Sequence, residues 1–197
     1  MKSTVIAITG GIGSGKSTAL KIVEKLGYKS FNADLTYKSM LEDAEFVKEV
    51  SSVLGVEPLT ENGKITLNRK AISTLVFQDS EALKRLNSFT HPKIMQNMLY
   101  LARNSEGLVF CEVPLLFEGK FQDLFDYVFI IKRNDDDRFN SVVLRDGKSI
   151  EAIKQIAKNQ CDYSKIYENG HTFIIENDGD EGCLEGKLKV VINKIKK

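Results

Sequence analysis

The sequence lacks several features that would place it in a specialised class of protein. Its three cysteines, Cys111, Cys161 and Cys183, are far apart and odd in number, so they fit neither a disulfide framework nor a closely spaced pair of metal ligands. No apolar run approaches the roughly 18 residues of a membrane-spanning helix, and the N-terminus has no signal-peptide order. We therefore expect a soluble, unprocessed protein of the reducing cytoplasm.

The sequence also lacks an excess of either charge. Lysine and arginine together number 28 and aspartate and glutamate 27, which gives a formal net charge of +1. This balance provides no general attraction for nucleic acid or an anionic membrane, so any anion has to be bound locally. The chain of 197 residues has no internal repeat and is long enough for one compact α/β domain. We expect no nucleic-acid or membrane partner and no obligate protein partner.

Five short apolar segments have the composition of buried strands. They lie at residues 4–8, 28–31, 108–113, 127–131 and 172–175. Their apolar residues are mostly continuous rather than alternating, which indicates burial on both faces. The pattern predicts a parallel sheet between two layers of helices.

Helical patterns fill the long connection between the second and third strands and also end the chain. Apolar residues at helical spacing in residues 46–54 precede Gly55, and Ser80 is positioned to cap a further helix. The polar loop of residues 177–182 leads to a last amphipathic helix that reaches Ile195. A helical connection of this length predicts a lobe with its own function.

The segment after the fourth strand predicts a pair of helices. Asn134 or Asp135 is expected to cap a helix that reaches Arg145, and Ser149 is expected to cap a helix of residues 150–159. Paired helices beside a nucleotide site often form a lid. We therefore expect a core of residues 1–34, 107–133 and 170–197, a helical insert of residues 35–106 and a lid of residues 134–169.

A glycine-rich loop joins the first strand to a helix of residues 17–26. Its sequence, GGIGSGKS, fits the pattern G-x-x-x-x-G-K-[ST], in which backbone N–H groups and the helix N-terminus surround phosphates. Lys16 is expected to reach the β- and γ-phosphates, and the Ser17 hydroxyl to ligate Mg²⁺. The flanking strand and helix disfavour the alternative of a flexible turn with an accidental lysine. The residues predicted to bind ATP here are Gly11, Ile12, Gly13, Ser14, Gly15, Lys16, Ser17 and Thr18.

Missing motifs narrow the class of nucleotide-binding protein. The chain has no N-K-x-D motif that reads guanine and no L-S-G-G-Q signature of transporter ATPases, and its neutral charge disfavours a helicase. A small-molecule kinase is the class that best fits what is left. Such an enzyme needs a group that orients and deprotonates the acceptor hydroxyl at the ends of the strands.

Acidic residues after two strands are candidates for this chemistry. Asp34 follows the second strand and is the candidate base, with a helix N-cap as its alternative role. Glu112, near the end of the third strand, is a candidate for Mg²⁺ and its water, or else a solvent-facing charge. His91 precedes Pro92, which we expect to open a helix, and a lone histidine is more often a structural hydrogen-bonding group. By pattern alone, residues 114–118 predict core packing with a helix cap.

Five motifs follow one another in a defined order. They are TGGIGSGKST at residues 9–18, Ala33-Asp34, His91-Pro92, VPLLFE at residues 113–118 and IENDG at residues 175–179. Together they make the chain resemble the dephospho-CoA kinase family along nearly its whole length. The resemblance implies a P-loop nucleoside-triphosphate-hydrolase-like, three-layer α/β fold with a five-stranded parallel sheet, a helical substrate-binding insert and a helical lid.

The resemblance also implies a reaction and a set of site residues. The γ-phosphoryl group of ATP would pass to the ribose 3′-hydroxyl of dephospho-coenzyme A, the last step of coenzyme A synthesis, with Mg²⁺ as cofactor. Asp34 would be the base, Arg145 the lid arginine that approaches the phosphates, and Asn177 a further ATP-binding residue. The acceptor pocket would contain Thr9, Asp34, Arg69, His91, Leu116, Phe117 and Glu118.

The chain departs from the family pattern at several positions. Asn32 stands where the family often has an aspartate, so Asp34 has to act alone. Ser141 occupies a helix position that is commonly arginine, and Arg138, one turn earlier, is positioned to substitute. Gly-His at residues 170–171 replaces the usual Ala-Asp. These departures concern contacts of the lid and of adenine.

Two other functions compete with this hypothesis. The chain could be a kinase of a nucleoside monophosphate or another alcohol, although the HP and VPLLFE motifs together disfavour that. A nucleotide-dependent binding module without catalysis would need no acid at Asp34. Replacing Asp34 therefore separates an enzyme from a binding module.

Overall fold

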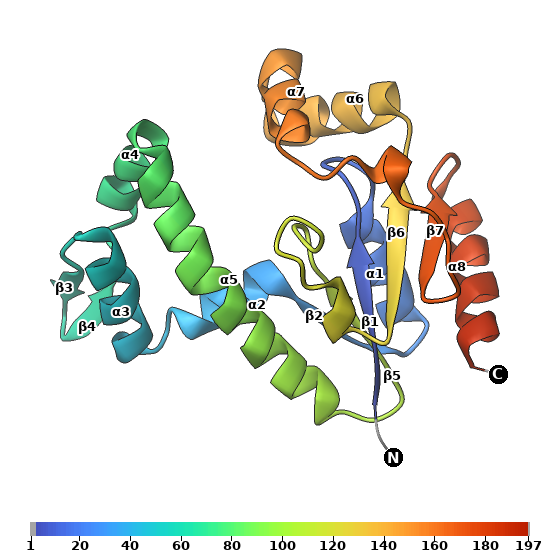
Figure 1. The fold of residues 1–197 in the computed structure, drawn as a ribbon, viewed down its shortest axis with the longest axis horizontal. Helices are drawn as coiled ribbons and strands as arrows, with labels where there is room; N and C mark the ends of the chain where they lie inside the picture. Colours follow the sequence, from blue (N-terminus) through green and yellow to red (C-terminus); the bar gives the residue numbers. More distant parts are fainter. Residues whose placement is uncertain (1–2, 197) are drawn as a thin grey trace. The chain divides into compact units, whose positions relative to one another are not determined.

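The computed structural model describes residues 3–196 (Figure 1). The chain forms two compact units. One, the insert unit, consists of Asn32–Tyr100, and the other, the sheet unit, joins the N-terminal segment up to Phe31 to the segment from Leu101 onwards. Within residues 3–196, none of the helices combines the length and the apolar character needed to cross a membrane.

The sheet unit is built on a five-stranded sheet with the order β2-β5-β1-β6-β7. Pairing is parallel between β1 and β5, between β1 and β6, and between β6 and β7. This confirms the predicted α/β fold with its parallel sheet. The strands are β1 (Thr4–Thr9), β2 (Lys29–Asn32), β5 (Leu108–Glu112), β6 (Tyr127–Lys132) and β7 (Thr172–Glu176).

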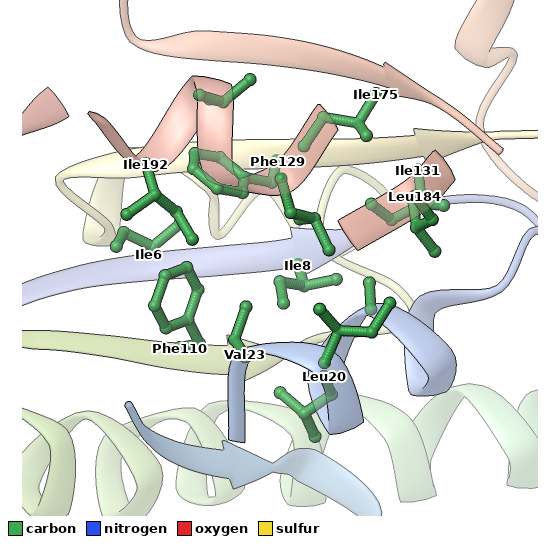
Figure 2. Close-up of a cluster of buried hydrophobic side chains, with 14 residues drawn as sticks. Ile6, Ile8, Leu20, Val23, Phe110, Phe129, Ile131, Ile175, Leu184 and Ile192 are labelled. Atoms are coloured by element: carbon green, nitrogen blue, oxygen red, sulfur yellow. The ribbon is translucent and has the colours of Figure 1, made fainter. Parts of the chain in front are cut away.

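The main core lies between the sheet and two helices, α1 (Lys16–Lys25) and α8 (Glu181–Ile195). Figure 2 shows the side chains of Ile6 and Ile8 on β1 together with Val23 of α1 and Ile192 of α8. Each apolar side chain buried in this way stabilises the fold by about 1.5–3 kcal/mol relative to exposure. The core fixes β1 and α1, and therefore both ends of the glycine-rich loop between them.

Two helices follow β6 in the sheet unit, and their caps confirm the prediction. The Asn134 side chain accepts the Asp137 N–H (2.9 Å) at the start of α6 (Asp135–Asp146). The Ser149 hydroxyl accepts the Ala152 N–H (3.2 Å) at the start of α7 (Ile150–Lys158). Phe139, Val142 and Ile153 form a small core between the helices, and Ile12 of the glycine-rich loop packs against it. Short 3-10 turns lie at Gln122–Leu124 and Tyr163–Lys165.

The insert unit has its own core, which includes Phe46, Val50 and Leu54. Its helices are α2 (Ala33–Met40), α3 (Ala44–Leu54), α4 (Arg69–Gln78) and α5 (Ser80–Arg103), the last of which continues into the sheet unit. The expected helix before Gly55 is confirmed, because α3 ends at Leu54 and Gly55 follows it with a left-handed φ of 65°.

Two features of the insert unit differ from the sequence-based expectation. A hairpin of β3 (Leu59–Glu61) and β4 (Lys64–Thr66) was not predicted, although Asn62 and Gly63 both have the positive φ that a tight hairpin turn needs. Pro92 does not open a helix but lies inside α5. α5 buries Ala82 before Pro92 and Ile94, Met95 and Met98 after it, and this burial compensates for the backbone hydrogen bond that proline removes.

The start of α5 also corrects one predicted cap. Ser80 is the first residue of the helix rather than its cap. The Asp79 carboxylate accepts the Glu81 N–H (2.8 Å) instead. Aspartate and serine are both good capping residues, so the sequence alone does not choose between neighbours.

Candidate active site

The glycine-rich loop follows β1 and ends at α1. Gly13 and Gly15 have φ values of 75° and 99°, which side-chain-bearing residues rarely adopt. A Cβ would also lie 2.2 Å from the Arg138 carbonyl oxygen at Gly13 and 2.3 Å from the Asn177 Nδ2 at Gly15. No side chain of the described residues caps α1, so its first N–H groups remain available to an anion. The loop therefore has the shape and the donors of a phosphate-binding loop, and it is called the P-loop below.

Lys16 is the cation of this loop. Its Nζ donates hydrogen bonds to the carbonyl oxygens of Gly10 (2.9 Å) and Gly11 (3.0 Å). Burial lowers the pKa of the Lys16 ammonium, while the nearby Glu112 carboxylate acts in the opposite direction. A charged amine held over the start of the loop lies where phosphate oxygens can replace the two carbonyls as its partners.

Ser17 and Glu112 are the candidate magnesium residues. Ser17 is exposed on the first turn of α1, and Glu112 is 7% exposed at the end of β5, within electrostatic range of Lys16. Within residues 3–196 no group of three or more His, Cys, Asp or Glu side chains forms a metal site. Mg²⁺ usually takes few protein ligands and relies on phosphate oxygens and water. The hydroxyl and the buried carboxylate therefore fit a magnesium ion that arrives with a nucleotide.

The segment after α7 lies against the P-loop and against the strand ends. The Gln160 side chain accepts the Ile12 N–H (2.8 Å), and the hydroxyls of Tyr163 and Thr9 are 3.3 Å apart. Burial raises the pKa of the Tyr163 hydroxyl, which therefore stays protonated and can donate. Sequence analysis missed Gln160 and Tyr163, because they lie in an irregular segment without a motif.

The loop after β5 meets the same segment. The rings of Phe117 and Tyr163 pack edge to face at 6.0 Å, and the Glu118 carboxylate accepts the Cys161 N–H (2.7 Å). Leu116 is fully buried. Three of the predicted acceptor residues, Thr9, Phe117 and Glu118, thus come together around residues 161–163.

A cavity of about 650 Å³ lies beside the P-loop within the sheet unit. Its lining includes Gly11 and Ser14 of the P-loop, Arg138 of α6 and Gln160. The Ser14 hydroxyl is buried and finds no hydrogen-bond partner among the described residues. The cavity is large enough for a small organic ligand and opens on the donors of the loop.

Arg145 and Asn177 hold different partners in this structure. The Arg145 guanidinium donates to the carboxylate of its neighbour Asp146 through Nε (2.7 Å) and Nη2 (2.9 Å), and 62% of its side chain is exposed. Its positive charge still contributes to lowering the Lys16 pKa. The Asn177 amide donates to the Ser14 carbonyl oxygen (2.9 Å) and so supports the P-loop directly.

The remaining predicted residues belong to the insert unit. Asp34 is exposed in the first turn of α2, and the capping role considered for it is filled by Asn32, whose side chain accepts the Leu35 N–H (3.1 Å). Arg69 begins α4, and its charge partly offsets the rise that burial causes in the Tyr37 pKa. His91 is half-buried in α5, and burial lowers its pKa, which favours the neutral imidazole.

Comparison with known proteins identifies the family of this chain. The family model for dephospho-CoA kinase matches residues 4–181. The dephospho-CoA kinase of Leptospira interrogans serovar Lai is 35% identical over 95% of this chain and 91% of its own length, and that of Fusobacterium nucleatum is 30% identical over 97% and 96%. A solved dephospho-CoA kinase from Campylobacter jejuni superposes with a TM-score of 0.65 at 28% identity and covers 98% of this chain and 97% of its own. The chain belongs to the dephospho-CoA kinase family, a family of phosphotransferases.

Proposed function

We propose that this chain transfers the γ-phosphoryl group of ATP to the ribose 3′-hydroxyl of dephospho-coenzyme A, the final step of coenzyme A synthesis. The observation that carries the proposal is the family match over residues 4–181, which includes the folded P-loop. Relatives named for this reaction span nearly all of the chain.

The P-loop and Lys16 bind the phosphates of ATP in this proposal. Residues 11–18 supply backbone N–H groups and the N-terminus of α1, which together favour negative charge. The Lys16 ammonium exchanges the Gly10 and Gly11 carbonyls for phosphate oxygens. Asn177 keeps the loop in shape through the Ser14 carbonyl.

Ser17 and Glu112 hold the magnesium ion that accompanies ATP. Ser17 offers its hydroxyl as a direct ligand, and the Glu112 carboxylate orients water around the ion. Mg²⁺ supplies charge neutralisation of the phosphates when bound.

Asp34 takes the proton of the acceptor hydroxyl. A positioned carboxylate base contributes about 10²–10⁴ in rate. The proposed acceptor-binding residues are Thr9, Arg69, His91, Leu116, Phe117 and Glu118. Arg69 rests on the resemblance of the segment LNRKAISTLVF (residues 67–77) to the family, and the others rest on the family motifs that contain them. Among these, Phe117 and Glu118 already contact the segment around Tyr163.

Arg145 is the proposed lid arginine for the transferring phosphoryl group. To reach the phosphates it has to leave the Asp146 carboxylate, which is an exposed pair of low net stability. The hydrogen bond to Asp146 raises the Arg145 pKa in this structure. An arginine side chain does not lose its proton in proteins, so the guanidinium also keeps its charge after it leaves Asp146. We place the enzyme in the cytoplasm, where its free cysteines remain reduced.

Mass spectrometry of the reaction products tests the proposed reaction. The purified protein is incubated with Mg²⁺-ATP and dephospho-coenzyme A, with adenosine monophosphate and shikimate as rival acceptors. We expect phosphoryl gain on dephospho-coenzyme A alone. Gain on a rival acceptor instead, or ATP binding without gain on any acceptor, contradicts the proposal.

A further inference from the structure

Arg138 of α6 holds its guanidinium against the P-loop. Its Nη1 lies 3.3 Å from the Ile12 carbonyl oxygen, and only 16% of the side chain is exposed. An ideal Cβ on Gly11 would lie 2.7 Å from the same nitrogen. The guanidinium therefore occupies the space that the missing side chain of Gly11 leaves open.

Neighbouring groups fix the guanidinium in this position. Its Nε donates to the Asp135 carboxylate one turn earlier (2.8 Å), and its carbon lies 4.4 Å from the centre of the Phe139 ring. The Gln160 side chain accepts a hydrogen bond from the Ile12 N–H, and Arg138 donates one to the Ile12 carbonyl oxygen. Residues outside the loop therefore bind both backbone groups of Ile12. Arg138 thus reaches the P-loop with little freedom left to lose when a ligand binds.

The position of Lys16 shows which end of the loop Arg138 faces. The Lys16 ammonium contacts the carbonyls of Gly10 and Gly11, and the lysine of a P-loop serves the β- and γ-phosphates. Arg138 lies beside Gly11, and its charge contributes to lowering the Lys16 pKa. Two cations therefore face the same end of the loop, where they repel each other unless an anion lies between them.

We propose that Arg138 binds the γ-phosphate end of ATP and, with Lys16, supplies the positive charge that holds this group for transfer. The inference rests on the proposed function in taking ATP as the anion. Within residues 3–196 the contacts to Asp135 and Ile12 engage only part of the guanidinium's N–H donors, so others can meet phosphate oxygens.

In this proposal Arg138 and Arg145 have different roles in binding the phosphates. Arg145 pairs through both Nε and Nη2 with Asp146 and is largely exposed, so it has to change conformation before it meets a phosphate. Among the described residues, Arg138 pairs with Asp135 through Nε alone, and its Nη1 already lies at the P-loop. Arg138 accordingly contributes to binding of the triphosphate before transfer begins.

Calorimetric titration of Arg138→Gln with ADP and with a non-hydrolysable β,γ-imido analogue of ATP, both with Mg²⁺, tests the inference. Loss of a charge-assisted contact to the terminal phosphate should weaken the ATP analogue by about tenfold more than ADP. Lys154→Gln, which removes an exposed charge from α7, should leave both affinities unchanged. Equal weakening of both nucleotides in Arg138→Gln, or none, overturns the proposal, because a residue that only supports the loop would affect ADP as well.

Gly11→Ala provides a second variant that leaves Arg138 in the sequence. Its Cβ would displace the guanidinium from beside the loop. We expect Gly11→Ala to weaken the ATP analogue preferentially in the wild-type background and to add little further preference in Arg138→Gln. If Gly11→Ala weakens the ATP analogue relative to ADP by the same factor in Arg138→Gln as in the wild type, the proposal is overturned.

The titrations separate this inference from the proposed reaction, because they need no acceptor. If Arg138→Gln selectively loses affinity for the ATP analogue but the wild type does not phosphorylate dephospho-coenzyme A, the reaction is wrong and the role of Arg138 stands. If the wild type phosphorylates dephospho-coenzyme A and Arg138→Gln keeps the wild-type preference, the role of Arg138 is wrong and the reaction stands.

Discussion

Asn32 and Asp34 stand two positions apart and serve different purposes. The Asn32 side chain caps α2 by accepting the Leu35 N–H, so the helix does not depend on Asp34 for its cap. Asp34 is exposed in the first turn, where its charge favours the helix by about 0.3–1 kcal/mol. A substitution that removes only its charge therefore tests chemistry with little structural cost.

Asp34→Asn should lower kcat by about 10²–10⁴, because an amide cannot take the acceptor proton. The affinity for ATP should stay close to that of the wild type, since the P-loop is unchanged. Steady-state kinetics with dephospho-coenzyme A and titration with ATP measure both quantities. Asp43→Asn is a matched control at the cap of α3 and should keep wild-type turnover. Undiminished kcat in Asp34→Asn would sink the assignment of the base.

Cys111 predicts a pH dependence of stability. It is fully buried on β5, and burial raises the pKa of its thiol from 9.0 to about 12. Because the folded protein keeps this proton to higher pH than the unfolded chain, the stabilisation is complete below pH 9 and is lost between pH 9 and about pH 12. From about pH 8 to about pH 10, the unfolding free energy of the wild type should fall by about 1.4 kcal/mol more than that of Cys111→Ala.

Denaturant unfolding of both proteins across this range measures the difference. The comparison cancels the lysines and tyrosines, which titrate in both proteins. A constant difference between wild type and Cys111→Ala at all pH values would show that the thiol titrates normally.

At the scale of elements, the P-loop depends on a contact from the loop after β7. The Asn177 amide donates to the Ser14 carbonyl oxygen at 2.9 Å, and Gly15 leaves it room. Asn177→Ala removes one hydrogen bond of about 0.5–1.5 kcal/mol, whereas Asn177→Asp places a carboxylate against a carbonyl oxygen. ATP affinity should therefore fall about threefold to tenfold in Asn177→Ala and further in Asn177→Asp.

Isothermal titration with ATP ranks the two variants. Asn169→Asp makes the same chemical change at an exposed position before β7, away from the P-loop. It should bind ATP like the wild type, which would show that the loss at Asn177 is local. Equal affinity of Asn177→Ala and Asn177→Asp would contradict a donor role of the amide.

Elements with a local signal could be predicted, and those that depend on distant packing could not. The caps Asn134 and Ser149 follow from side-chain chemistry within one turn of the helix. The length of α5 did not follow, because Pro92 lies inside it and local propensity predicts a break there. The Asn62-Gly63 turn had a recognisable signal, but its flanking strands are only three residues long.

The candidate site also contains residues that the sequence could predict and residues that it could not. The P-loop is visible in the sequence because glycines, lysine and serine have to follow one another along the chain. Gln160 and Tyr163 contact the P-loop and β1 from more than a hundred residues away in the sequence. No motif with a fixed spacing therefore predicts these contacts. The sequence indicated Arg138 as a substitute for the arginine that Ser141 replaces, but its place beside Gly11 could be seen only in the structure.

At the scale of the whole molecule, the strand order supports the proposed position of the nucleotide. β1 lies between β5 and β6, so the course of the chain reverses at the carboxyl end of β1, where open α/β sheets bind ligands. The sequence predicted the strands but not their order, because short apolar strands carry no signal of their neighbours. A ligand at this point stabilises the native state as a whole, since it binds the folded protein and not the unfolded chain.

Lys16→Ala should therefore remove most of the stabilisation that ATP provides. With Mg²⁺-ATP at about 100 times the wild-type Kd, the wild type gains about 2.7 kcal/mol of unfolding free energy. Loss of a charged contact weakens binding by about 10–100-fold, which leaves the variant about 0.4–1.4 kcal/mol at the same concentration.

Without nucleotide the variant should be no less stable than the wild type, because burial already lowers the Lys16 pKa and penalises its charge. Thermal unfolding with and without ATP measures both values, and Lys21→Ala, an exposed lysine on the same helix, should respond like the wild type. An undiminished ATP response in Lys16→Ala would mean that the glycine-rich loop is not where this protein binds its nucleotide.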